Sequence, residues 1–162
     1  MILLRRCFWR CIGRLLFRCS PHPTYGYRRL LLKLAGMRQG RNVRFRRSVD
    51  IDHPWNISIG DLTMIGDDVL MRASAPIRIG ARCVISQYCT LLTSTRETAP
   101  SEIMIEDDCW VATDSLVLPG ARLEDGVVVG ARAMVEGHLP GWQIATGEPA
   151  VARRERVLNT GS

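Results

Sequence analysis

The sequence predicts an all-β solenoid, a parallel β-helix of hexapeptide repeats with N-terminal amphipathic helices. The first observation is an aliphatic residue at every sixth position of one stretch, namely Ile105, Val111, Val117, Leu123, Val129 and Val135. The second is a small or slim residue four positions after each of the first five, namely Cys109, Ser115, Ala121, Val127 and Ala133. A period of six is typical of parallel β-helices, whereas an α-helix requires a period near 3.6.

The same period occurs earlier in the chain, with two slips in phase. Its aliphatic positions are Ile59 and Ile65, followed by Ile79, Ile85 and Leu91. The phase slips by two within residues 71–77 and again within residues 94–103. Six residues make one short strand and a turn, and three strands make a triangular coil that pairs with the next coil at about 4.8 Å. Glycines near the bends, such as Gly60 and Gly126, are expected to supply positive φ.

The N-terminal third of the chain differs sharply in charge from the rest. Residues 1–48 contain thirteen Arg or Lys residues and no Asp or Glu, whereas the remainder contains nine basic and sixteen acidic residues. A basic segment on an acidic body indicates an anionic surface as partner for that segment alone, and argues against general nucleic-acid binding.

Residues 1–20 form a basic amphipathic arm. Arginines recur at every fourth position and so share one helical face, namely Arg6, Arg10, Arg14 and Arg18. The arm lacks the roughly 20 uncharged residues of a membrane span, and its charges argue against a signal peptide. Two interpretations remain: a helix on an anionic membrane surface with Phe8 and Trp9 inserted, or a helix packed on the solenoid. We favour the membrane surface.

The rest of the chain divides into three parts. Residues 21–42 are expected to form a lead-in segment and a helix that caps the open end of the solenoid. The β-helix itself is expected over residues 43–140, followed by a C-terminal turn and basic tail at residues 141–162. Residues 93–102 are a polar interruption of the repeats, and such insertions become loops that often lie on the binding side of a solenoid.

The cysteines and histidines do not indicate a metal site. Three cysteines, Cys83, Cys89 and Cys109, occupy the small inward position of a hexad and are expected to be buried thiols. The other three lie in the arm without the paired spacing of a zinc site. The histidines His22, His53 and His138 share no hexad phase, so a three-histidine zinc centre is set aside. A reducing, cytoplasmic setting fits this cysteine usage.

Several short motifs resemble those of the left-handed β-helix hexapeptide acyltransferases. They are Ile59-Gly60-Asp61, Ile65-Gly66-Asp67-Asp68, Ile85-Ser86-Gln87, Trp110-Val111-Ala112-Thr113-Asp114, Pro119-Gly120, Val129-Gly130-Ala131-Arg132 and Gly147-Glu148-Pro149-Ala150. Two further motifs resemble the colanic acid biosynthesis branch, whose members are O-acetyltransferases of exopolysaccharide building blocks. These are Ser20-Pro21 with Tyr25-Gly26-Tyr27-Arg28-Arg29, and Pro54-Trp55-Asn56.

The resemblance implies a left-handed parallel β-helix that uses acetyl-CoA to acetylate a sugar hydroxyl. It also implies a homotrimer with active sites between neighbouring prisms. By that resemblance, the pantetheine arm would contact Trp110, Thr113, Gly130 and Ala131. The tail arginines Arg153 and Arg154 would approach the nucleotide phosphates.

The chain departs from the family pattern at the general base. The family carries a histidine in the loop after the Ile-Ser-Gln coil, and alignment from Ile85-Ser86-Gln87 places Arg96 at that position. Arginine does not lose its proton in a protein and so cannot accept one. Substitutes would be Glu97, His53 or His138, or no side chain at all, and the catalytic residue stays open.

Three functions follow from these observations. The first is an acetyl-CoA-dependent O-acetyltransferase acting on a sugar hydroxyl in exopolysaccharide or related envelope glycan biosynthesis. The second is a catalytically silent member of the same family that binds CoA or serves as a scaffold. The third is a membrane-surface adaptor with the solenoid as a platform.

Overall fold

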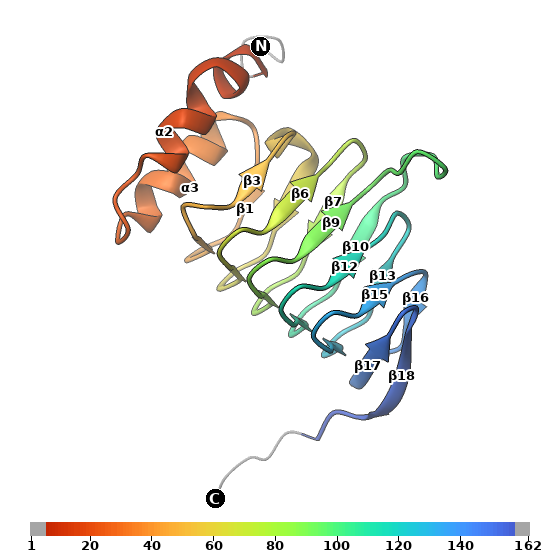
Figure 1. Ribbon diagram of the computed structural model, residues 1–162. Coiled ribbons are helices and arrows are strands. Elements are labelled where there is room, and N and C mark those ends of the chain that lie inside the picture. Colours follow the sequence, from red (N-terminus) through yellow and green to blue (C-terminus); the bar gives the residue numbers. More distant parts are fainter. Residues whose placement is uncertain (1–5, 158–162) are drawn as a thin grey trace, which may run out of the picture.

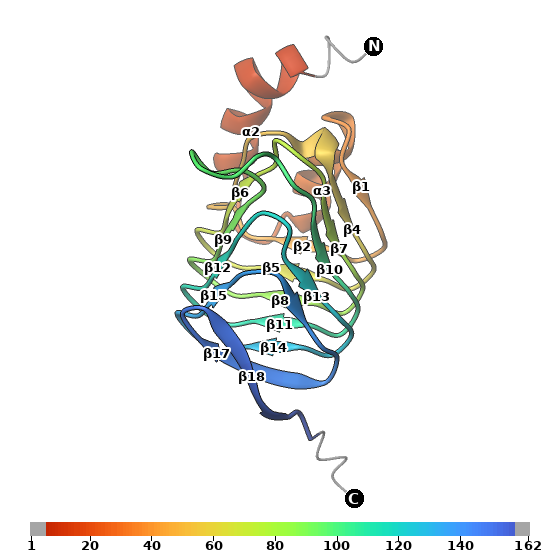
Figure 2. The same cartoon turned by 90° about the vertical axis from the view of Figure 1, so that its right-hand side faces the viewer.

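The computed structural model describes residues 6–157, which form a three-sided parallel β-helix of about five turns preceded by helices (Figures 1 and 2). The first sheet contains β1 (Arg38–Gln39), β4 (Ile57–Ile59), β7 (Ile77–Ile79), β10 (Ile103–Ile105), β13 (Arg122–Leu123) and β16 (His138–Leu139). The second contains β2 (Arg44–Phe45), β5 (Met64–Ile65), β8 (Val84–Ile85), β11 (Trp110–Val111), β14 (Val128–Val129), β17 (Gln143–Gly147) and β18 (Ala150–Glu155). The third contains β3 (Asp50–Ile51), β6 (Leu70–Arg72), β9 (Thr90–Leu92), β12 (Leu116–Val117) and β15 (Met134–Val135). The prediction of a parallel β-helix of hexapeptide repeats with N-terminal helices is confirmed.

The core is the column of hexad residues inside the prism. The aliphatic residue of each strand points inward and is buried, as Ile85, Val111 and Val129 show on three successive coils of the second sheet. The small residues four positions later are also buried, and Cys83, Cys89 and Cys109 lie among them as free thiols. Burial raises the pKa of the Cys89 thiol to about 11, so it packs as a small apolar side chain.

The slips in phase have a single structural origin. Strand partners on neighbouring coils show how many residues each coil contains. Ile65 pairs with Ile85, twenty residues later, and Ile85 pairs with Val111, twenty-six residues later. The extra residues lie where the chain passes from the third sheet to the first. Eight residues separate Met71 from Ile79 at this passage, whereas six separate neighbouring hexad positions at the other corners.

The arm is helical and packs on the first coil. It continues through the π-helix η1 (Trp9–Gly13) into α2 (Arg14–Arg18). Trp9 is only 2% exposed, and its Nε1–H donates to the Ile51 carbonyl at 3.0 Å. The expectation that Trp9 inserts into a membrane is therefore wrong, because the apolar face that contains it is already covered by the solenoid. Within residues 6–157, no helix has the length and apolar character to cross a bilayer.

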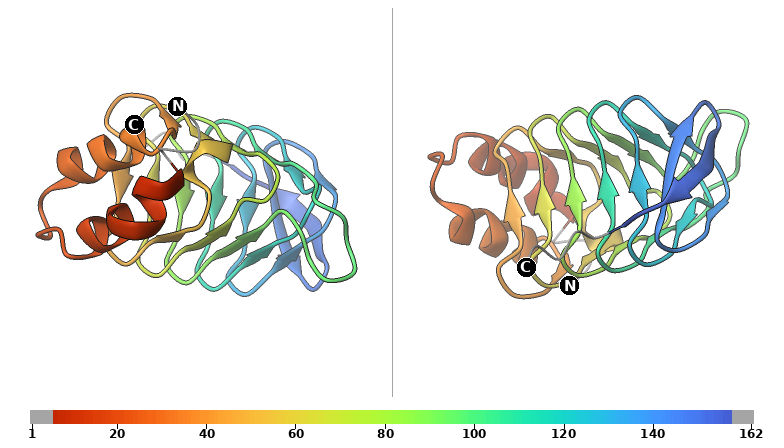
Figure 3. Two further views of the ribbon diagram at one scale, coloured as in Figure 1. Left: turned by 90° about the horizontal axis from the view of Figure 1, so that it is seen from above. Right: turned by 90° about the horizontal axis from the view of Figure 1, so that it is seen from below.

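The helix α3 (Tyr25–Leu34) covers the N-terminal end of the prism, and a hairpin closes the other end. Leu31 and Leu32 of α3 are buried in the core that continues into the coils. At the far end, β18 runs antiparallel to β17, which extends the second sheet by two strands. Figure 3 shows the helices and this hairpin at opposite ends of the row of coils.

Candidate functional site

The extra residues of successive coils stack into one strip, which we call the loop edge: residues 52–56, 73–76 and 93–102. The first segment contains the short 3-10 helix η2 (Pro54–Asn56). The Asn56 Nδ2–H donates to the Ala73 carbonyl at 2.7 Å, which joins the first segment to the second. The Ala75 N–H donates to Thr93 Oγ1 at 2.9 Å, which joins the second to the third. Hydrogen bonds therefore tie three distant insertions into one continuous surface.

Arg96 and Glu97 lie at the exposed tip of the third segment. The tip is held by the Thr95 hydroxyl, which accepts the backbone N–H of Glu97 at 3.2 Å and of Thr98 at 2.9 Å. This segment borders a hollow of about 580 Å³ that is completed by Leu118, Pro119 and Glu136 from the two following coils. Among the described residues, Arg96 forms no ion pair, so its guanidinium is available at the mouth of this hollow.

The two histidines considered as substitute bases occupy different places. His53 lies on the loop edge, two coils before Arg96, with its ring edge-on to Trp55 at 5.1 Å between centroids. His138 lies in β16 on the last coil, where its Nε2 is 2.8 Å from Glu124 Oε1. That contact is the main reason why the pKa of Glu124 is lowered. The His138 ring is thus held by Glu124 on the first sheet, two residues after Glu136, which lines the same hollow as Arg96.

The residues that the family resemblance implies for the pantetheine arm form a second strip, which we call the donor edge: Trp110, Thr113, Gly130 and Ala131. Trp110 lies on the outer face of the second sheet, 47% exposed, and its Nε1–H donates to Ser86 Oγ at 2.9 Å. The other three residues lie at the corner where the chain turns from the second sheet to the third. The Thr113 hydroxyl donates to the Gln87 carbonyl at 3.0 Å, so successive coils are joined here as well.

The tail arginines Arg153 and Arg154 are exposed on β18. The strand order β18-β17-β14-β11 places them on the same sheet as Trp110, at its C-terminal end.

One chain does not bring the donor edge and the loop edge together. The donor edge lies where the third sheet begins, and the loop edge lies where it ends, so the width of that sheet separates Arg96 from Thr113. Nor do His, Cys, Asp or Glu side chains gather in threes as a metal site would need, in the part of the chain from residue 6 to 157.

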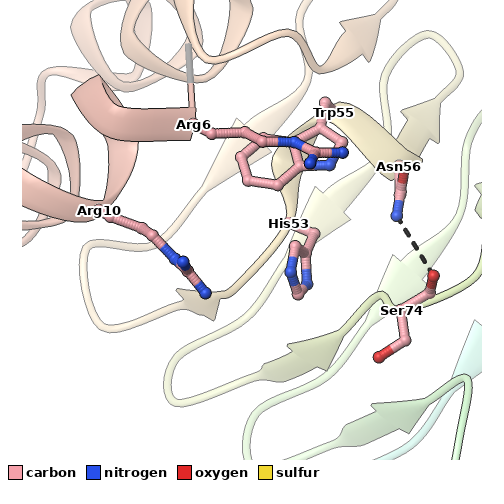
Figure 4. Close-up of a pocket in the computed structure, with 6 residues that line it drawn as sticks. All are labelled: Arg6, Arg10, His53, Trp55, Asn56 and Ser74. Carbon is pink, nitrogen blue, oxygen red and sulfur yellow. Dashed lines mark hydrogen bonds between the residues drawn. The ribbon is translucent and has the colours of Figure 1, made fainter. Parts of the chain in front are cut away.

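The sequence did not predict that the arm reaches the loop edge. Arg6 and Arg10 line a second hollow there, together with His53 and Trp55 (Figure 4). Their spacing predicted a shared helical face, but a helical period carries no information about which coil that face contacts.

Comparison with known proteins gives a family and a fold. A scan against models of protein families found no match. The chain is 41% identical over 156 residues to a protein of Escherichia coli K12 named for colanic acid biosynthesis as an acetyltransferase, WcaF. The match covers 92% of this chain and 86% of that protein.

Solved structures of similar shape are hexapeptide-repeat acetyltransferases. One from Vibrio cholerae superposes with a TM-score of 0.87 at 24% identity, covering 96% of this chain and 93% of that one. A galactoside acetyltransferase in complex with coenzyme A superposes with a TM-score of 0.84 at 20% identity, covering 96% and 82%. At these identities the likeness shows the fold.

Proposed function

The chain belongs to the family of the colanic acid biosynthesis acetyltransferases, and from that membership we propose that it transfers an acetyl group from acetyl-CoA to a sugar hydroxyl. The product would be an acetylated unit of an exopolysaccharide or related envelope glycan. The observation that carries the proposal is the 41% identity to WcaF over 92% of the chain. The solved acetyl-CoA complex of the Vibrio cholerae acetyltransferase, with a TM-score of 0.84, supports acetyl-CoA as the donor.

The reaction requires two surfaces. In it the acceptor oxygen attacks the thioester carbonyl carbon, the C–S bond breaks, and the acceptor proton is passed on as CoA leaves as a thiol. We assign the donor edge, Trp110, Thr113, Gly130 and Ala131, to the pantetheine arm. The exposed Trp110 indole supplies an apolar surface there. Gly130 lets the next coil pack closely at this corner, because a Cβ would lie 2.6 Å from Thr146 Cγ2. Arg153 and Arg154 are assigned to the CoA phosphates, because guanidinium groups bind phosphate oxygens in pairs.

The acceptor side is assigned to the loop edge around Arg96. Because arginine cannot accept a proton, we propose that this loop orients the acceptor through its charge and does not act as the general base. Loss of a general base typically lowers the rate by a factor of about 10² to 10⁴. Positioning of the two substrates alone would still allow slow transfer. Glu97 is adjacent to Arg96 and His53 lies on the same edge, whereas the His138 ring is already hydrogen-bonded to Glu124.

Replacing Arg96 by histidine tests this assignment. We expect R96H to raise kcat for acetyl transfer by about 10-fold or more, because an imidazole can accept the acceptor proton at neutral pH. R96Q is the matched control, since it removes the charge without adding a base. The measurement is release of the CoA thiol with a panel of neutral and phosphorylated sugars. A wild-type rate already as high as that of R96H would contradict the loss of the base.

Arg96 also favours a second function, a catalytically silent member of the family that binds CoA as a scaffold subunit. Titration calorimetry with acetyl-CoA separates the possibilities. Binding without turnover in both wild type and R96H would favour the silent member. Absence of binding at millimolar acetyl-CoA would remove the donor-edge assignment, and W110A, which removes the indole from that edge, shows whether observed binding uses it.

The separation of the two edges supports a homotrimer. Within one prism the donor edge and the loop edge lie at opposite sides of the third sheet, so a complete site needs the loop edge of a neighbouring copy. Sedimentation equilibrium should give a mass near three times 18.2 kDa. A monomer that nevertheless transfers acetyl groups would contradict the shared site.

We further propose that the helices rest on the cytoplasmic face of an anionic membrane. Trp9 faces the solenoid, but the outer side of the helices exposes Ile12, Leu15, Leu16, Leu30 and Leu34 beside basic residues. Flotation with phosphatidylglycerol vesicles tests this at low and high salt, with phosphatidylcholine vesicles as the control. L15E should abolish flotation, because a carboxylate on this face opposes both insertion and charge attraction.

A further inference from the structure

The N-terminal end of the loop edge carries a pocket of about 290 Å³ whose lining combines the arm with the first two coils. Arg6 and Arg10 come from the arm, His53, Trp55 and Asn56 from the first coil, and Ser74 from the second. Figure 4 shows Arg10 and His53 pointing toward the same space, with Arg6 and Trp55 beside it. Residues that are distant in sequence therefore converge on one hollow.

Several side chains of this pocket are positioned by neighbours. The Arg6 guanidinium lies over the Trp55 ring, 5.2 Å from its centroid, which holds the charge at the rim. The same indole meets the His53 ring edge-on. Asn56 is held in turn by the backbone of the second coil, because its Nδ2–H donates to the carbonyls of Ala73 at 2.7 Å and Ser74 at 3.5 Å.

The two arm arginines have no carboxylate partner among the described residues. Arg14, one turn further along the same helical face, pairs with Asp50, whereas Arg6 and Arg10 form no such pair in the described chain. Asp52 adjoins the pocket, with its Oδ2 3.0 Å from His53 Nδ1, although that nitrogen makes no hydrogen bond. The other Asp52 oxygen, Oδ1, accepts the Ala73 N–H at 2.8 Å. The pocket thus has an excess of positive charge.

We propose that this pocket binds the phosphate group of a phosphorylated sugar and so anchors the acceptor glycan precursor at the loop edge. The proposal rests on the proposed function, because it gives that enzyme's acceptor a chemical class. Two guanidinium groups offer forked N–H donors beside the His53 ring, and such donors suit the three terminal oxygens of a phosphate better than the two of a carboxylate. The volume lies near the lower end of small-ligand pockets, which fits a phosphate with one attached sugar.

Continuity along the loop edge connects this pocket to the acceptor loop. The Ser94 hydroxyl donates to Ser74 Oγ at 3.4 Å; Ser74 lines the pocket, and Ser94 belongs to the segment that carries Arg96. A glycan held by its phosphate at Arg6 and Arg10 would therefore extend along hydrogen-bonded coils toward Arg96. Its hydroxyl groups, and not the phosphate, would then reach the reacting end of the edge.

Titration calorimetry of the full chain with glucose 1-phosphate, pyrophosphate, glucuronate and glucose tests the pocket. We expect glucose 1-phosphate and pyrophosphate to bind at least tenfold more tightly than glucuronate or glucose. The double variant R6Q/R10Q should lose at least tenfold in phosphate affinity, because it removes charge-assisted hydrogen bonds. The matched control R18Q/K33Q removes two exposed cations outside the pocket, one from α2 and one from α3, and should change affinity less than twofold.

The remaining outcomes are distinct. Equal loss in both double variants would show general charge attraction and overturn the site, as would glucuronate binding as tightly as glucose 1-phosphate. Phosphatidylglycerol vesicles distinguish a lipid source: vesicle binding that depends on Arg6 and Arg10 without binding of soluble phosphates would overturn the acceptor assignment. Acetyl-CoA affinity, measured on the same proteins, should be unchanged. If acetyl-CoA fails to bind any of them while glucose 1-phosphate binds, the proposed function fails and the pocket stands.

Discussion

Arg28 shows how one buried side chain connects the helices to the solenoid. It lies on α3 and is only 1% exposed. Its Nε–H donates to the Phe45 carbonyl at 2.8 Å, and its terminal nitrogens donate to Ser20 Oγ, the Pro21 carbonyl and the His22 carbonyl at 2.9 to 3.0 Å. Burial lowers the pKa of the guanidinium, but arginine starts so high that it remains charged.

Replacing Arg28 by lysine should destabilise the protein by about 2–4 kcal/mol, because one ammonium cannot donate to four acceptors in these directions. Urea unfolding followed by circular dichroism measures the change. The neighbouring variant R29K, at a half-buried position, is the control and should cost less than about 0.5 kcal/mol. If R28K proved equally mild, the four hydrogen bonds would not be a main support of the lead-in segment.

A second lesson at the residue scale concerns glycine. The sequence predicted positive φ at Gly60 and Gly126, and only Gly126 has it, at +71°. At Gly60 a Cβ would lie 2.5 Å from the backbone nitrogen of Ala81 on the next coil. That glycine is therefore required by close contact between coils, which depends on a partner twenty-one residues away and has no local signal.

At the scale of elements, the arm is attached to the first coil by both apolar and ionic contacts. Trp9 and Phe17 are buried, with their rings 6.0 Å apart between centroids. The ionic contact joins Arg14 to Asp50, which also pairs with Arg72 at 3.2 Å. Burial of Asp50 opposes ionisation, but the guanidinium groups of Arg72 and Arg14 outweigh it and hold the pKa of that carboxyl below its usual range.

Arm docking should therefore weaken in acid. A carboxyl with a lowered pKa in the folded protein contributes stability above its unfolded pKa, near 3.9, and loses it as the pH falls from there through the folded pKa. We expect hydrogen exchange of residues 9–18, corrected for the intrinsic pH effect, to speed up below about pH 4.

The variant D50N should speed that exchange at pH 7 by a few-fold at most, because the pair is partly exposed to solvent. It should also remove the acid dependence. D114N, which removes a surface pair with Arg132 on a distant coil, is the control and should leave the arm unchanged. If hydrogen exchange of the arm changed neither at low pH nor in D50N, the arm would be held by its apolar contacts alone.

At the scale of the whole molecule, stability comes from one column of hexad side chains. Each coil buries its apolar residues against those of its neighbours, so the apolar core is confined to the interior of the prism. Ile65 and Met64 illustrate this on β5, where adjacent side chains point to opposite sides of the sheet. Ile65 is fully buried, whereas Met64 is 39% exposed.

I65A should lower the free energy of unfolding by about 2–5 kcal/mol, because it leaves a cavity between two coils that cannot collapse. M64A, on the outer face of the same strand, should cost less than about 1 kcal/mol. Guanidinium unfolding of both variants measures the difference. Equal effects would mean that the column inside the prism does not dominate stability.

The sequence by itself determined the fold and the family, because both are indicated by features that can be recognised along the chain: a regular period and short contiguous motifs. A hexad position decides whether its side chain points inward, so Ile105 to Val135 could be placed in the core without knowledge of their partners. Motifs such as Trp110-Val111-Ala112-Thr113 are contiguous in the chain, so their resemblance to a family could be recognised without the fold. The loop at residues 93–102 was predicted for the same reason, as a break in the period.

Only the tertiary structure decided which distant segments meet. It buried Trp9 against Ile51, aligned three insertions into the loop edge, and brought Arg6 and Arg10 to His53. It also separated Thr113 from Arg96 on one prism. These outcomes depend on how coils stack and where the arm docks, and such long-range contacts leave no periodic trace in the chain.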